Sequence, residues 1–392
     1  MGPAASPEVW QRSHPLVLSL AYPGWLGVYS AAQGLGPVMG TYYDFYDARR
    51  SNLVDLLLDT PSLRAVVIHG IPPGALELST LIGERAPAIR VYFVYHGALS
   101  APFHVNSGEA ELLTGILDLG MEGLVHSVGT IKYGFHETLL ALGLQRASTV
   151  PNFPVVLPHL ILHKHSDLDG LLHIGVLASS GGSHKNMIAQ LVAACTLPNA
   201  VVHVTVMPAL DYLDYCTAEI VETGILPHDR FMEEITKLDV LMYVSLVECF
   251  PMIVLEGAAA GIPVLVSRTH HLFDSDPMLD KALVVHEADN PSEISRRLKE
   301  LASPAFRAAL RPNLLALAGC MQRKAELAWS RFLGLSHSER LHLGFLLDLN
   351  SSALELATED SVCLPPSSQS LGALQAAPLL PPPLRPPSAW PL

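Results

Sequence analysis

The sequence predicts an α/β protein built from two Rossmann-like domains, each with a largely parallel sheet. Short apolar runs alternate with helical patterns in both halves of the chain, which is typical of βαβ units. The length of 392 residues is sufficient for two domains. Pro151 and Pro154 interrupt the alternation near the middle, and we expect the domain boundary within residues 155–170.

The first half of the chain contains four apolar runs that predict buried strands. They lie at residues 16–20, 65–69, 91–95 and 123–127. A glycine-bearing stretch at 22–40 follows the first run, and an amphipathic pattern at 134–144 predicts a helix after the fourth. We therefore assign residues 16–160 to an N-terminal Rossmann-like domain and residues 1–15 to an N-terminal extension.

The second half repeats the alternation. Strands are predicted at residues 171–177, 200–206, 240–244, 263–266 and 283–285. Helices are predicted at residues 185–195, 231–237, 252–260 and 291–301, and the last has Asn290 as N-cap and Pro291 as first residue. Residues 161–345 thus form a C-terminal Rossmann-like domain. Residues 364–392 are rich in Pro, Ser, Leu and Ala, which predicts a disordered tail.

Charge and composition disfavour several classes of partner. The net charge of −13 makes nucleic acid and anionic lipid poor main partners, although peripheral membrane contact stays open. No stretch of about 20 apolar residues occurs, so we expect no transmembrane helix. The first residues lack a secretory pattern, and we expect a cytoplasmic protein. The five cysteines form no CxxC pair, which predicts buried free thiols in a reducing compartment rather than a zinc site.

The most informative segment covers residues 248–264, with the sequence ECFPMIVLEGAAAGIPV. A predicted strand ends near Val244, Pro251 suits the first position of a helix, and Gly261 suits its C-terminal cap. Pro263 then opens another strand. This arrangement exposes the first-turn N–H groups of a helix at the carboxyl edge of a parallel sheet, where ligands of such sheets bind. Free donors and the helix dipole both favour an anion there, such as a phosphate.

Two glutamates flank this predicted anion site. Glu256 lies in the second turn of the helix, where its carboxylate can accept two hydrogen bonds from ribose hydroxyl groups. Glu248 precedes the helix and can face a sugar. The alternative interpretation is that both are solvated at a helix edge. The neighbouring Phe-Pro pair, small-residue helix and Gly-x-Pro exit favour the site.

This segment closely resembles the E-x7-E signature of retaining GT-B glycosyltransferases, especially family 4. The resemblance covers about residues 90–300 and is strongest at residues 239–266. Outside the signature, four features resemble parts of the family. They are the strand at 174–177 followed by Lys185 and Asn186, the Val-Pro-Asn of residues 150–152, Gly224, and residues 231–245.

The resemblance implies a GT-B fold, with two Rossmann-like domains facing each other across a cleft, and a sugar transferred from a nucleotide-diphosphate sugar to an unidentified acceptor. It implies that Glu248 contacts the transferred sugar, Glu256 holds the ribose and Lys185 neutralises the diphosphate. His96 would face the donor from the N-terminal domain. Further donor-binding positions are Phe250, Pro251, Met252 and Gly175. No cofactor and no metal ion are expected.

One departure from the family bears on activity. Val176 stands where the family usually carries an arginine, so one basic diphosphate contact is missing. Lys185 with the amides of residues 179–183 can suffice, Arg268 or His184 can substitute, or catalysis is weak or lost. The N-terminal half also lacks a clear glycine-rich acceptor loop, for which residues 23–27 are the nearest candidate.

Two other functions stay open. One is a non-catalytic relative that binds a nucleotide sugar or a partner protein, and the other is a nucleotide-sugar epimerase on the same fold. The chain has no P-loop motif, which disfavours an NTPase of that class. Two Asp-x-Asp patterns, at 167–169 and 274–276, could hold a metal ion, but neither directly follows a buried strand. We expect both to be solvated loops.

Overall fold

The fold was analysed in a computed structural model. It describes residues 16–22, 24–33, 38–39, 48–72, 74–97, 109–152, 170–178, 183–208 and 216–336. The predicted N-terminal extension, the Pro-rich tail and the first Asp-x-Asp pattern lie outside the described residues.

The N-terminal domain contains a parallel sheet in the order β2-β1-β3-β4-β5-β6. Its strands are β1 Val17–Ala21, β2 Val38–Met39, β3 Ala65–His69, β4 Arg90–Tyr95, β5 Ser127–Thr130 and β6 Ala147–Thr149. Its helices are α2 Leu26–Gln33, α3 Ala48–Leu58, α4 Ala75–Arg85, α6 Glu109–Met121 and α7 Phe135–Ala141. Strands β1 and β3 are buried along their whole length, as expected for strands that are covered on both faces of a parallel sheet.

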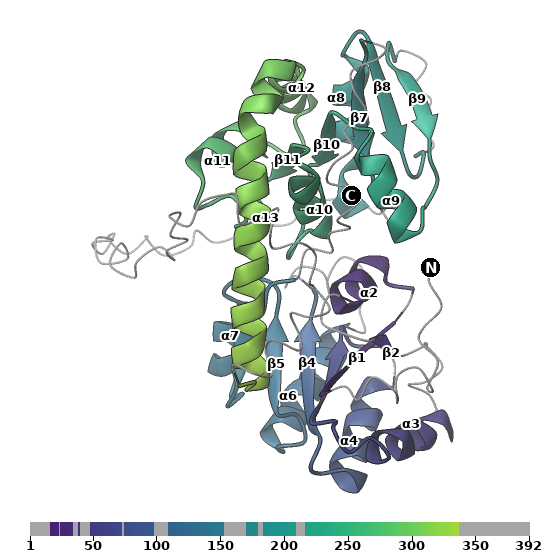
Figure 1. The fold of residues 1–392 in the computed structure, drawn as a ribbon, viewed down its shortest axis with the longest axis vertical. Helices are drawn as coiled ribbons and strands as arrows, with labels where there is room; N and C mark the ends of the chain where they lie inside the picture. The colour runs from purple at the N-terminus through teal and green to yellow at the C-terminus, as the bar shows by residue number, and fades with distance from the viewer. Residues whose placement is uncertain are drawn as a thin grey trace, which may run out of the picture.

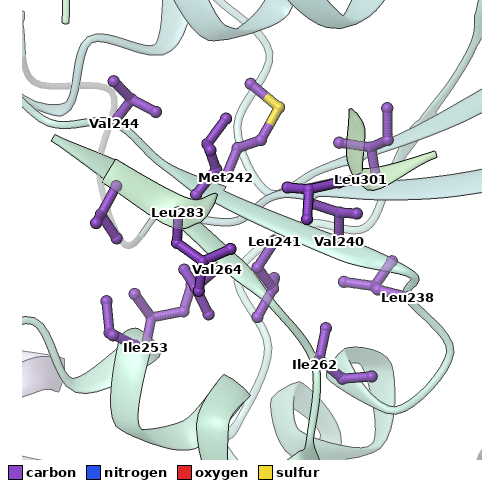
Figure 2. Close-up of a cluster of buried hydrophobic side chains, with 14 of the residues drawn as sticks. Leu238, Val240, Leu241, Met242, Val244, Ile253, Ile262, Val264, Leu283 and Leu301 are labelled. Atoms are coloured by element: carbon purple, nitrogen blue, oxygen red, sulfur yellow. The ribbon is translucent and has the colours of Figure 1, made fainter. Parts of the chain in front are cut away.

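The C-terminal domain repeats this plan, with a parallel sheet in the order β12-β11-β10-β7-β8-β9. Its strands are β7 Leu172–Val176, β8 Ala200–Val204, β9 Glu219–Glu222, β10 Val240–Tyr243, β11 Val264–Ser267 and β12 Val284–Val285. Its helices are the 3-10 turn η3 Ser183–Lys185, α8 Met187–Cys195, α9 His228–Ile235, α10 Met252–Ala260, α11 Pro277–Leu283 and α12 Pro291–Leu301. Leu241 and Val264 lie in the core between β10, β11 and α10 (Figure 2).

The long helix α13, Pro304–Leu333, joins the two domains (Figure 1). Its first half packs into the C-terminal core through Leu310 and Leu314. Its last turns pack against β1, β3 and β4 of the N-terminal sheet through Trp329 and Phe332. The indole N–H of Trp329 also donates a 2.8 Å hydrogen bond to the carbonyl of Pro151. The chain therefore returns from the second domain to the core of the first.

Most of the predicted elements are confirmed to within three residues. The prediction of a strand at 123–127 is wrong, because Gly123 adopts a φ of +81° in a turn and β5 begins only at Ser127. Pro251 is the N-cap of α10 rather than its first helical residue. Several elements were not predicted, namely the strands β2, β6 and β9 and the helices α2, α3, α4, α6, α11 and α13. Strand β9 lies at the sheet edge with both of its glutamates exposed, so its residues form no buried apolar run.

The expectation of free cysteines is also wrong for Cys195, Cys216 and Cys320, which are disulfide-bonded. Cys195, at the end of α8, and Cys216, which precedes β9, form a disulfide bond. Cys249 is a free thiol. Within the described part of the chain, no helix is both long enough and apolar enough to cross a membrane.

Candidate functional site

The carboxyl edges of the two sheets face each other, and the segments that follow their strands are in direct contact. Lys132, after β5, donates a 2.9 Å hydrogen bond to the backbone carbonyl of Glu248, after β10. The thiol of Cys249 donates to the carbonyl of His96, after β4, at 2.8 Å. The segment around Glu248 therefore lies where the two domains meet, as expected for a ligand site at the ends of parallel strands.

Lys185, Tyr243 and Glu248 form a hydrogen-bonded cluster at this edge. The ammonium of Lys185 lies 2.6 Å from Oε1 of Glu248, and the Tyr243 hydroxyl donates to the same oxygen at 2.7 Å. Lys185 also donates to the Tyr243 hydroxyl. The Lys185 and Glu248 side chains are only 13% and 9% exposed, so solvent screens this ion pair weakly.

The loop that carries Lys185 is fixed to the end of β10 by two amide side chains. Asn186, which adopts a left-handed φ of 52°, donates from Nδ2 to the carbonyl of Val244 at 3.0 Å. Gln190 accepts from the amide of Val244 at 2.9 Å. These bonds fix the backbone next to Lys185 against the end of β10, so the ammonium has a defined position.

Burial sets the protonation of two neighbouring groups. It raises the pKa of the Tyr243 hydroxyl well above its usual value, and the adjacent Glu248 carboxylate raises it further. Burial, again helped by Glu248, raises the pKa of the Cys249 thiol to about 12. Both groups therefore carry their protons at neutral pH and act as hydrogen-bond donors.

Helix α10 presents an open N-terminus at the same edge. In the C-terminal domain, the helices α11, α12 and α13 are capped by the side chains of Asp276, Asn290 and Ser303. The N-cap of α10 is Pro251, and like α8 and α9 this helix has no side-chain cap among the described residues. The N–H of Val254 donates to the carbonyl of Pro251 at 3.2 Å, which leaves the N–H groups of Met252 and Ile253 to bind an anion, and the helix dipole also favours one there.

Glu256 is 4% exposed and lies on the buried face of α10. Its Oε1 accepts a 2.9 Å hydrogen bond from Nε2 of His228, at the start of α9. The alternative interpretation of solvated glutamates is therefore wrong for both Glu248 and Glu256. A buried carboxylate that has one oxygen held by a histidine keeps the other oxygen available for a further donor.

His96 lies on the N-terminal side of the interface and is partly exposed. Its Nε2 is 3.1 Å from Nδ1 of the fully buried His69. Burial lowers the pKa of His96 to about 3 and lowers that of His69 as well. Both imidazoles are therefore neutral at physiological pH.

The remaining predicted donor-binding residues differ in position. Phe250 packs against the cores of both domains, and its carbonyl accepts a 3.4 Å hydrogen bond from Asn152. Pro251 and Met252 form the start of α10. Gly175 lies inside β7, where an added Cβ would meet the side chain of Leu238 at 2.5 Å. Packing accounts for this glycine, and its part in donor binding stays a prediction.

The structure also shows the surroundings of Val176, which stands in place of the family's arginine, and of its two possible substitutes, Arg268 and His184. Val176 is 1% exposed and belongs to the C-terminal core. Arg268 binds both oxygens of Asp280, at 2.7 and 2.8 Å. His184 adjoins Lys185, and its pKa is lowered by burial and then by the Lys185 charge. In the second Asp-x-Asp pattern, Asp276 accepts from two backbone amides as the N-cap of α11.

Sequence reasoning missed Lys132, His228 and Tyr243. Tyr243 is the last residue of β10, so its place at the sheet edge was open to prediction. His228 follows the segment at Gly224 that resembles the family. Lys132 was missed because the strand before it was predicted at residues 123–127, whereas β5 ends at Thr130, two residues before Lys132.

Comparisons with known proteins concern the fold. No protein-family model matches the chain, and no curated protein sequence matches it. Among solved structures, Anabaena HepE in complex with UDP-glucose matches with a TM-score of 0.59 and 11% identity, covering 80% of this chain and 99% of that chain. Sucrose-phosphate synthase from Thermosynechococcus elongatus matches with a TM-score of 0.56 and 12% identity, covering 88% and 100%.

The trehalose-6-phosphate synthase OtsA gives a TM-score of 0.55 at 13% identity, covering 85% of each chain. At such identities the likeness establishes the fold alone. It confirms the GT-B arrangement of two Rossmann-like domains that the sequence predicts.

Proposed function

We propose that this chain is a glycosyltransferase that transfers a sugar from a nucleotide-diphosphate sugar to an acceptor. One observation carries the proposal. Buried Glu248 and Glu256, Lys185 and the uncapped start of α10 come together where the two domains meet. These groups match the ribose, diphosphate and sugar of such a donor in chemistry. Glu248, the start of α10 and Glu256 also follow one another along the chain in the order of sugar, diphosphate and ribose.

Each part of the donor has a candidate partner. The first-turn amides of α10 and the ammonium of Lys185 stabilise the charge that develops on the leaving diphosphate. The free oxygen of Glu256 accepts from a ribose hydroxyl. Glu248 and His96 contact the transferred sugar from the C-terminal and N-terminal domains. Lys185 and backbone amides neutralise the diphosphate in this scheme, which needs no metal ion.

We further propose transfer with retention of configuration, as in family 4, because of the E-x7-E spacing of Glu248 and Glu256. Two structural neighbours support these choices. Trehalose-6-phosphate synthase is described as an enzyme of glycosyl transfer with retention. HepE is in complex with UDP-glucose, which makes UDP-glucose the first donor to test. The acceptor would enter from the N-terminal domain.

A second candidate function is a binding protein with weak or no catalysis. Two observations favour it. The core residue Val176 offers no charge where the family carries an arginine. The only strong contacts of the Lys185 ammonium among the described residues are Glu248 and Tyr243, so a diphosphate would have to share that ammonium.

Donor hydrolysis in the absence of acceptor tests the two candidates. A panel of nucleotide sugars, beginning with UDP-glucose, is incubated with the wild type and with the Glu256→Ala and Lys185→Ala variants. The transferase predicts released nucleoside diphosphate from the wild type and at least a tenfold loss in both variants. Glu300→Ala, which removes a glutamate that is 43% exposed on α12, serves as the matched control. Binding without turnover would favour the second candidate.

A further inference from the structure

His96 forms a hydrogen-bonded pair with His69, a residue to which the proposed transfer scheme gives no part. The two histidines lie at the ends of neighbouring strands. His69 is the last residue of β3, and His96 comes directly after β4. The ring centroids are 5.3 Å apart, and Nδ1 of His69 lies 3.1 Å from Nε2 of His96. His69 is completely buried, so it cannot contact a ligand itself.

His69 is held in a fixed place by the helix that joins the domains. Its ring stacks on the indole of Trp329 in α13, with centroids 5.8 Å apart and an interplanar angle of 26°. Trp329 is itself fixed by its hydrogen bond to Pro151. On the other side, the backbone carbonyl of His96 accepts from the thiol of Cys249. The pair thus has packing partners from both domains.

The hydrogen bond between the two rings restricts their tautomers. Burial keeps both imidazoles neutral, so each ring has one N–H donor and one acceptor nitrogen. Nε2 of His69 is buried and has no hydrogen-bond partner among the described residues. If this nitrogen carried the proton, an N–H group would be buried without an acceptor, which is rarer in proteins than an unpaired acceptor.

The remaining arrangement places the proton of His69 on Nδ1, from which it donates to Nε2 of His96. His96 must then carry its own proton on Nδ1. Among the described residues, none is hydrogen-bonded to that nitrogen. His96 therefore has one N–H group left to donate to a bound molecule.

We propose that His69 is a positioning residue that fixes His96 as the Nδ1–H tautomer, so that His96 donates a hydrogen bond to an oxygen of the transferred sugar. The identity of this ligand rests on the proposed function, whereas the tautomer of His96 does not. Conserving the shape of the ring at position 69 would not be sufficient for this role, because the donor at Nδ1 is what sets the state of His96.

Nitrogen-15 NMR of histidine-labelled full-length protein tests the tautomer without any donor. Signals are assigned by comparison with His69→Asn and His96→Asn variants. The wild type should show His96 protonated at Nδ1. His69→Asn should keep this signature, because the asparagine amide nitrogen takes the place of Nδ1 and can donate. His69→Leu, which has no donor, should lose it. Protonation of His96 at Nε2 in the wild type, or no change in His69→Leu, would overturn the proposal.

Kinetics then test whether the tautomer matters for transfer. We expect His69→Leu to lower kcat at least tenfold with little change in KM for the nucleotide sugar, and His69→Asn to restore most of the rate. Binding of the free nucleoside diphosphate should be unchanged in both variants. Equal rates in His69→Leu and the wild type would contradict the positioning role. If no variant and no wild type shows turnover, the proposed function fails, and the NMR result still decides the tautomer.

Discussion

The ammonium of Lys185 lies 2.6 Å from the Glu248 carboxylate, and this ion pair links the loop after β7 to the loop after β10. The two residues are 63 positions apart in the sequence. Because both side chains are largely buried, each charge is stabilised mainly by its partner and only weakly by solvent. A diphosphate bound beside Lys185 would therefore compete with the Glu248 carboxylate for the Lys185 charge, and we assign that carboxylate to the sugar.

Replacing Lys185 with methionine should destabilise the protein as well as weaken donor binding. The variant leaves a buried carboxylate whose remaining hydrogen bond comes from Tyr243, and breaking buried pairs in this way costs about 3 kcal/mol or more. Urea unfolding of the wild type, Lys185→Met and Lys185→Arg measures this. The arginine variant should recover part of the loss. A Lys185→Met variant as stable as the wild type would show that the pair is solvated.

Glu256 should give the protein a preference for ribonucleotides. If its free oxygen accepts from ribose, removal of the 2′-hydroxyl from the ligand should weaken binding about tenfold or more, and Glu256→Gln should reduce that discrimination. Calorimetric titration with paired ribo- and 2′-deoxyribonucleoside diphosphates measures the ratio. His228→Gln keeps a donor toward Glu256 and serves as a control that should retain the preference. Equal affinities for both sugars in the wild type would refute the ribose contact.

Lys132 should stabilise the contact between the domains. Its ammonium donates to the backbone carbonyls of Glu248 and Thr269, which both belong to the C-terminal domain. Hydrogen bonds from charged donors contribute about 1.5–3 kcal/mol each when buried, and Lys132 is only partly buried, so Lys132→Met should cost about 2 kcal/mol in total. Urea unfolding tests this, with Lys324→Met on α13 as a surface control. Equal loss in both variants would contradict the interdomain role.

His270 should make the protein less stable in acid. Burial, followed by the nearby Lys132 charge, lowers the pKa of His270 to about 4, whereas an unfolded histidine titrates near about 6.5. The contribution of His270 to the free energy of unfolding is therefore present above about pH 6.5 and is lost as the pH falls through about 4.

Between pH 7 and pH 5 this group should remove about 2 kcal/mol of stability. His270→Asn keeps an acceptor for the amide of Leu272 but cannot be protonated, so its stability should fall less over the same interval. Urea unfolding at the two pH values gives the comparison. An identical pH dependence in both proteins would mean that His270 titrates normally in the folded state.

The parts of the site that lie close together in sequence were predictable. Strand, turn and helix around Glu248 and Glu256 follow from local apolar spacing and from the glycine cap at Gly261, which adopts a φ of +70°. The positions that sequence reasoning missed are joined by tertiary contacts. The bonds of Lys132 to Thr269 and of His69 to His96 link residues that are 137 and 27 positions apart, and no local pattern predicts such pairs.

Helix α13 was missed for a different reason. Leu310, Leu314 and Leu317 repeat at helical spacing, which is a usable signal. Pro312 lies between them and would normally end a helix, yet it is accommodated inside this one. The structure alone shows that α13 leaves the C-terminal core and packs into the N-terminal core at Trp329.

Calorimetric titration of the wild type with UDP, ADP and GDP tests the central claim most directly. If the start of α10 binds a diphosphate and Glu256 binds the adjoining ribose, at least one of the three should bind, and both Lys185→Met and Glu256→Gln should weaken that binding at least tenfold, while Glu300→Gln leaves it unchanged. The absence of binding for all three nucleotides, or equal affinity in the wild type and both site variants, would contradict the account.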